Sequence, residues 1–223
     1  MLLSVAMSAD GYIDDARGRG LRLSDAADAD RVDELRAASD AIMVGARTIR
    51  TDNPRLLVRS EQRQHRRAAA GLPSTPRKVT ITASADLDPQ FRFFADASAP
   101  PLVYAPAGGA ARAAATLAGV AEVVAVPTEP GQHRLDLSWP LADLAARGIG
   151  RLLVEGGASL LAQFLSGGVA DELRLAIAPV FIADPRAPRL LGGARPAGRL
   201  RLAGLEQVGD MAVLRYLPSR PTC

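Results

Sequence analysis

Short apolar runs alternate with helical patterns along most of the chain. Runs rich in β-branched and other apolar residues predict buried strands, and apolar residues at helical spacing predict helices. The predicted strands are 2–7, 41–44, 78–82, 102–104, 122–126, 151–154, 172–178, 200–208 and 211–217. Helices are predicted after Ser24 and over 110–118, 138–148 and 157–165.

Two helix starts have a candidate capping residue. Ser24 is followed by the acids Asp25 and Asp28, which suit the positive end of a helix dipole. Ser138 precedes Pro140, a residue that is favoured in the first helical turn. We therefore predict Ser24 and Ser138 as N-caps. Residues 59–77 are polar, rich in arginine and bounded by proline, which predicts an exposed, mobile loop.

The order of these elements predicts the fold class. Strands that alternate with helices favour an α/β protein with a mostly parallel sheet and helices on both faces. Gly209-Asp210 between the last two strands indicates a hairpin, so antiparallel strands are expected at one edge. No linker, repeat or low-complexity segment interrupts the pattern, which predicts one domain over residues 1–223.

Composition excludes several classes. One cysteine, Cys223, cannot build a disulfide framework or a zinc cluster, and His65 and His133 are isolated, so no metal site is expected. The apolar runs are shorter than the ~20 residues that span a bilayer, and the N-terminus has no basic leader. We expect a cytoplasmic enzyme or binding protein without a membrane partner.

The net charge of the chain is small, but the residue type that supplies the positive charge is unusual. The formal net charge is +3 and the sequence pI about 9.6, and Lys78 is the only lysine, so arginine supplies nearly all the positive charge. Arginine binds phosphate through a planar fork. Aromatic residues make up only 4%, which leaves little for stacking on bases. This favours a phosphorylated small molecule over nucleic acid as the ligand.

Three strand ends carry polar, glycine-containing turns. Gly45 ends a buried strand and is followed by Ala46-Arg47-Thr48; Glu155-Gly156-Gly157 ends another; Ser8-Ala9-Asp10-Gly11 ends the first. Helix N-termini at the carboxyl ends of parallel strands bind phosphate through free backbone N–H groups. Each segment alone is also compatible with an ordinary turn, which is the favoured interpretation of Ser8-Ala9-Asp10-Gly11. The usual dinucleotide and P-loop glycine motifs are absent.

Together these segments resemble a known family. S-x-D-G near the start, LRAASDAIMVGARTIRTDNPRLLVR in 35–59, LLVEGGASLL in 152–161 and GVADELRLAIAP in 168–179 resemble the reductase domain of riboflavin biosynthesis, from about Leu2 to Leu217. The resemblance implies a three-layer sandwich related to dihydrofolate reductase, a homodimer, and NADPH-dependent reduction of a ribosylamino-pyrimidine 5′-phosphate to its ribityl product.

The resemblance also implies roles for individual residues. The cofactor would contact Gly45, Arg47, Thr48, Asp52, Ser84, Gly156, Gly157, Ala158, Ser159 and Leu160. The substrate would contact Arg36, Leu56, Arg59 and Glu155, with the two arginines clamping its phosphate. Asp52 and Glu155 are the carboxyl groups expected to position the ribityl hydroxyls or deliver a proton. Either Arg47 or Arg50 is expected at the adenosine 2′-phosphate.

Some positions depart from the family pattern. Ser4 stands where lysine or asparagine is frequent, Asn53 replaces a second aspartate, and Ala83 replaces another. The zinc deaminase motifs H-x-E and P-C-x-x-C are absent, so the chain is expected to act as a reductase alone. Two alternatives stay open: reduction of another heterocycle of the dihydrofolate or pterin kind, and nucleotide binding without catalysis.

Overall fold

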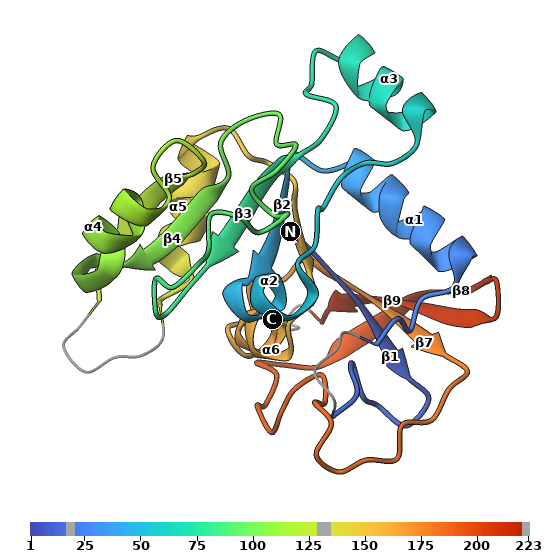
Figure 1. Ribbon diagram of the computed structural model, residues 1–223. Helices are drawn as coiled ribbons and strands as arrows, with labels where there is room; N and C mark the ends of the chain where they lie inside the picture. Colours follow the sequence, from blue (N-terminus) through green and yellow to red (C-terminus); the bar gives the residue numbers. More distant parts are fainter. Residues whose placement is uncertain (17–20, 129–134, 220–223) are drawn as a thin grey trace. The chain divides into compact units, whose positions relative to one another are not determined.

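A computed structural model describes residues 1–16, 21–128 and 135–219 (Figure 1). The chain divides into two compact units, one formed by Met1–Val32 with Leu153–Cys223 and the other by Asp33–Leu152. One domain over residues 1–223 therefore stays a prediction. His133 and Cys223, which the sequence analysis considered, lie outside the described residues.

The first unit is organised around its first strand. β1 (Leu2–Ser8) pairs in parallel with β6 (Leu152–Glu155) on one side and with β7 (Glu172–Ala178) on the other. β7 pairs antiparallel with β9 (Met211–Pro218), which pairs antiparallel with β8 (Leu200–Val208). Helix α6 (Ala158–Ser166) follows β6 and buries most of its apolar side chains, namely Leu160, Leu161, Ala162, Phe164 and Leu165.

The second unit contains four parallel strands in the order β5-β4-β3-β2. They are β2 (Ala41–Gly45), β3 (Arg77–Ile81), β4 (Leu102–Pro106) and β5 (Glu122–Val126). The helices of this unit are α2 (Ala46–Asp52), α3 (Glu61–Ala69), α4 (Ala107–Thr116) and α5 (Ser138–Ala146). α1 (Ala26–Ala37) runs across the division between the units.

Small side chains let α4 approach the strands of the second unit closely. Ala110 and Ala113 of α4 pack with Ala85 and with Ala105 of β4, and Val123 of β5 joins this cluster. The four alanines are all less than a tenth exposed. The apolar interior of β2 is also completely buried, which matches its prediction as a continuous apolar strand.

The predicted fold class is confirmed. The pairing is mostly parallel, and the C-terminal strands form the expected antiparallel hairpin, whose turn places Gly209 at φ +58°. The predicted strands agree with the observed ones to within two residues at each end. No helix in the described ranges is long and apolar enough to cross a membrane, and no cluster of potential metal ligands occurs there.

Both predicted N-caps are wrong. α1 begins at Ala26, and the carboxylate of Asp25 accepts the backbone N–H of Asp28 at 2.8 Å. Asp25 also accepts the backbone N–H of Asp210 at 3.1 Å, so a contact with the distant hairpin favours the aspartate over Ser24. Ser138 is the first residue of α5 rather than its cap, and donates its own N–H to Asp136 at 2.9 Å.

The predicted loop at 59–77 is also wrong in part, because it contains α3. The hydroxyl of Ser60 caps this helix by accepting the N–H of Arg63 at 3.4 Å. Arg67 is only 3% exposed and donates to the carbonyls of Ala37 and Ser39, at 2.8 and 2.7 Å. The polar composition predicts a solvated loop, but Arg63 and Arg66 pair with acids and Arg67 binds carbonyl groups within the second unit.

Candidate active site

In the second unit, the junction between β2 and α2 has the form expected of a phosphate site. Gly45 ends β2 and precedes α2 with φ −72°, and no side chain caps the N–H groups of the first turn. That turn contains no acidic residue. Arg47 is exposed and Thr48 is half-buried at its start. These residues offer N–H groups, a guanidinium and a hydroxyl to an anion.

The end of α2 explains the asparagine that follows Asp52. Asn53 adopts a left-handed conformation with φ +44°, which asparagine tolerates better than most residues. Its N–H donates to Ile49 at 3.1 Å, and its side-chain oxygen accepts the N–H of Arg92 at 2.6 Å. Asp52 is exposed and accepts the hydroxyl of Thr51 at 2.7 Å, so its carboxylate remains at the surface.

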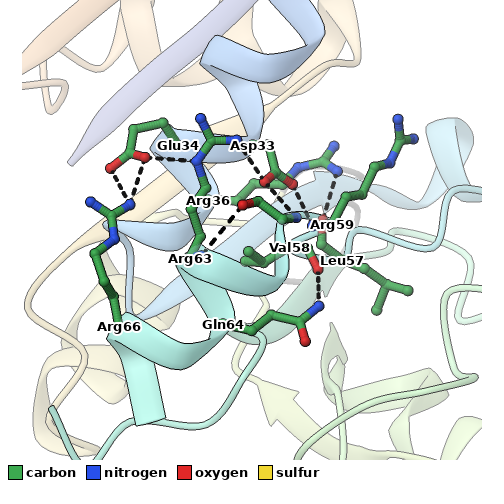
Figure 2. A network of polar contacts seen from close by, with 10 residues as sticks. Asp33, Glu34, Arg36, Leu57, Val58, Arg59, Arg63, Gln64 and Arg66 are labelled. Carbon is green, nitrogen blue, oxygen red and sulfur yellow. Dashed lines mark hydrogen bonds and ion pairs between the residues drawn. The ribbon is translucent and has the colours of Figure 1, made fainter. Parts of the chain in front are cut away.

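The three predicted substrate residues of the second unit lie on or beside the segment after α2. Leu56 is buried and has φ +50°, a strained conformation for a leucine. Arg36, from α1, donates to the carbonyl of Leu57 at 3.2 Å, and Arg59 is exposed. In Figure 2 the side chains of Arg36 and Arg59 both extend away from α3. The fold of this unit therefore places Arg36 against the segment that carries Arg59, the other cation that the resemblance assigned to phosphate.

Ser84 lies in a tight loop after β3. The hydroxyl of Thr82 accepts the N–H of Ala85 at 3.1 Å, and Ala85 has φ +57°. Two arginines hold this loop: Arg112 donates to the carbonyl of Ser84 at 3.3 Å, and Arg50 donates to that of Asp86 at 3.1 Å. Arg112 could not be predicted as part of this loop, because nothing near it in the sequence connects α4 with residues 82–86.

In the first unit, the turn between β6 and α6 depends on two glycines. Gly156 has φ +62° and Gly157 has φ +80°, and no side chain caps the start of α6. The first turn of α6 has no acidic residue. Leu160 is different from its neighbours: its side chain is 5% exposed and its N–H already donates to Gly157 at 3.0 Å. The N–H groups before Leu160 are thus the better anion donors.

Glu155 is the last residue of β6 and pairs in register with Ser4 of β1. Its exposure is intermediate.

Asp10, just after the end of β1, has a structural role instead. Its carboxylate accepts the hydroxyl of Ser8 at 2.6 Å and the N–H of Ala183 at 2.8 Å, and these bonds lower the pKa of Asp10. The turn that follows β1 thus anchors the loop after β7.

The fold and these turns define an α/β protein of the dihydrofolate reductase-like class, with uncapped helix starts at the carboxyl ends of parallel strands. Residues 1–214 match the model of the RibD C-terminal domain, and the chain belongs to that family.

Known proteins resemble it over nearly their whole length. A 2,5-diamino-6-ribosylamino-4(3H)-pyrimidinone 5′-phosphate reductase from Archaeoglobus fulgidus is 33% identical, over 94% of both chains. One of the same name from Methanothermobacter thermautotrophicus is 34% identical, over 97% of this chain and 96% of its own. A pyrimidine reductase-like protein from Corynebacterium diphtheriae has a TM-score of 0.83 at 26% identity, covering 98% of this chain and 91% of its own.

Proposed function

We propose that this protein reduces the ribosyl group of 2,5-diamino-6-ribosylamino-4(3H)-pyrimidinone 5′-phosphate to a ribityl group in riboflavin biosynthesis, with NADPH as reductant. The observation that carries the proposal is the match, over almost the full length of both partners, to reductases of that name. The relatives' name specifies the 2,5-diamino compound, which supports the aminated pyrimidine over its deaminated form as the substrate.

The local geometry supports a dinucleotide cofactor. The start of α6, with Gly156 and Gly157 at positive φ, allows close approach of a pyrophosphate to backbone N–H groups. The resemblance also assigns to the cofactor Gly45 at the end of β2 and Arg47, Thr48 and Asp52 of α2. When bound, NADPH supplies the hydride that reduces C1′ of the opened ribose.

The remaining roles belong to side chains that hold the substrate. Arg36 and Arg59 bind its phosphate, each through a charge-assisted pair of hydrogen bonds. Leu56 and Glu155 contact the rest of the substrate. We assign Glu155 and Asp52 to orienting the ribityl hydroxyls, and the imine nitrogen takes up a proton as C1′ is reduced. Holding the reacting carbons at near-attack distance can supply up to ~7–11 kcal/mol of the barrier.

One assay tests the function. We expect purified protein to oxidise NADPH with the diamino ribosylamino-pyrimidine phosphate, and far more slowly with the deaminated form or with dihydrofolate. Faster reaction with dihydrofolate would assign the protein to the reduction of another heterocycle. Tight NADPH binding without turnover of any of the three would indicate a nucleotide-binding protein instead.

We further propose that Arg112, Arg50 and Ser84 read the 2′-phosphate that distinguishes NADPH from NADH. The two guanidinium groups hold the backbone on either side of Ala85, next to the exposed Ser84. Arg50 thus has stronger support than Arg47, the other residue that the sequence offered.

Removing a charged hydrogen-bond donor should weaken recognition of the 2′-phosphate. Arg112→Ala and Arg50→Ala should each lower the ratio of kcat/KM for NADPH to that for NADH by at least about tenfold. Arg66→Ala is the control, because Arg66 is exposed in the same unit but pairs with Glu34. A loss in Arg47→Ala alone would assign the 2′-phosphate to Arg47 instead of Arg50 and Arg112.

A homodimer and a cytoplasmic location, both inferred at the sequence level, are part of this proposal. Sedimentation at several concentrations measures the oligomeric state. A monomer at all concentrations contradicts the first inference without affecting the proposed reaction.

A further inference from the structure

The segment Leu57–Ser60 carries the predicted phosphate ligand Arg59 but belongs to no strand. Side chains from two helices satisfy its backbone instead (Figure 2). Arg36 donates to the carbonyl of Leu57 at 3.2 Å, and Gln64 of α3 donates to that of Val58 at 2.8 Å. Because the segment has no ladder of its own, these side chains determine where it lies.

Asp33 of α1 makes the closest contacts with this segment. Its carboxylate accepts the backbone N–H of Arg59 at 2.6 Å and that of Ser60 at 3.2 Å. The Asp33 side chain is only 5% exposed. Hydrogen bonds to an ionised carboxylate are stronger than neutral ones, and burial reduces their competition with water. The backbone is therefore held most firmly at the residue whose guanidinium is assigned to substrate.

Arg63 of α3 balances the buried charge of Asp33. Its Nη1 lies 3.0 Å from a carboxylate oxygen of Asp33, and its Nε donates to Glu34 at 2.7 Å. Arg66 binds the same Glu34 at 2.7 Å. Glu34 thus connects α1 with α3 but has no bond to the segment among the described contacts, whereas Asp33 bonds to both. Glu34 therefore only holds the two helices together, whereas Asp33 also fixes the backbone at Arg59.

We propose that Asp33 is a positioning residue for the reaction: it fixes the backbone at Arg59 so that the Arg59 guanidinium meets the substrate phosphate. The proposal rests on the proposed function, because it needs Arg59 to bind that phosphate. Asp33 itself does not touch substrate or cofactor.

Asp33→Asn tests the proposal. Asparagine keeps the shape but replaces one acceptor oxygen with a donor, which opposes the N–H groups of Ser60 and Arg63. We expect KM for the phosphorylated substrate to rise roughly tenfold or more, because a small displacement of a substrate-binding group has large effects. Values of kcat and of KM for NADPH should change little.

Three comparisons separate positioning from general damage to the fold. Glu34→Gln removes an acid from the same helix and network, and should leave KM for the substrate unchanged. With the dephosphorylated substrate, wild type and Asp33→Asn should have the same KM. Asp33→Asn should add nothing to the rise in KM that Arg59→Ala causes by itself. An equal rise with both substrates, or additive effects, would overturn the proposal.

These measurements distinguish failure of the proposed function from failure of the positioning role of Asp33. Absence of turnover by the wild type would remove the proposed function. An active wild type whose KM rises in Arg59→Ala but not in Asp33→Asn would remove only the role of Asp33. If Asp33→Asn does not fold, Asp33→Glu keeps the charge for Arg63 but displaces the carboxylate by a methylene. The same selective rise in KM is expected there, and a normal KM contradicts the proposal.

Discussion

Individual backbone conformations decide which residues can occupy the predicted ligand-binding turns. Gly157 precedes α6 with φ +80° and ψ 98°, a region that residues with a Cβ rarely enter. Asn53 and Leu56 also have positive φ, but one is an asparagine and the other is held in a buried position. The glycine pair was identified from the sequence because glycine is itself the signal; the strain at Leu56 has no such signal.

Gly157→Ala should destabilise the protein by about 1–3 kcal/mol, because the new side chain forces an unfavourable φ. It should also weaken NADPH binding, since the turn must move to relieve the strain. Chemical denaturation and a cofactor titration measure the two effects. Gly108→Ala is the matched control: Gly108 lies in α4 with nothing within 4 Å of an added Cβ, so this change should raise stability by about 0.5–1 kcal/mol. Equal effects of the two changes would contradict the conformational argument.

At the scale of elements, tertiary contacts override local signals. Ser24 and Asp25 are both good N-caps, yet Asp25 caps α1 because the same carboxylate also binds the turn between β8 and β9. An added Cβ at Gly209 of that turn would lie 2.1 Å from Asp25 Oδ2, so helix and hairpin fit closely. Likewise α3 forms in a segment that reads as a loop, because acids of α1 pair with its arginines.

Asp25→Ala should lower the stability of the protein, and Asp25→Asn should lower it less, because asparagine still caps a helix. Hydrogen bonds from Asp28 and Asp210 lower the pKa of Asp25 below its usual 3.8. The stabilisation is therefore present above that value and is lost as the pH falls through the lowered pKa. Unfolding midpoints of wild type and Asp25→Ala should converge in acid; a constant difference from neutral to acid pH would contradict this role.

For the molecule as a whole, much of the arginine excess in the described part of the chain makes contacts within the protein itself. Many of the arginines pair with acids: Arg31, Arg55, Arg63, Arg66, Arg77, Arg147, Arg174, Arg186 and Arg215. Others, such as Arg67, bind backbone carbonyls. Lys78, the only lysine, is buried and donates to Phe93 and Ala95 at 2.9 and 2.5 Å.

Lys78 should make global stability depend on alkaline pH. Burial lowers the pKa of Lys78 from 10.5 to about 8. Between these values the unfolded chain binds more protons than the folded protein, so the free energy of unfolding should rise with pH. The gain is up to about 3 kcal/mol. Lys78→Met, which cannot titrate, is the reference in denaturation experiments. Curves of the two proteins that stay parallel from pH 8 to 10.5 would contradict the shift.

The sequence by itself determined the strands, the glycine turns and the family, because these depend on local patterns of apolar residues, on the special backbone freedom of glycine and on continuous motifs. Gly45 and Glu155 could be named because each ends a predicted strand, whereas Asp52 was named through the resemblance to the family. Only the tertiary structure decided the cap of α1, the helix at 61–69, the contact of Arg112 with the Ser84 loop and the bonds of Asp33 to Arg59. Each of these depends on contacts between residues far apart in the chain, such as Asp25 with Asp210 and Asp33 with Arg63, and such contacts leave no periodicity or motif in the sequence.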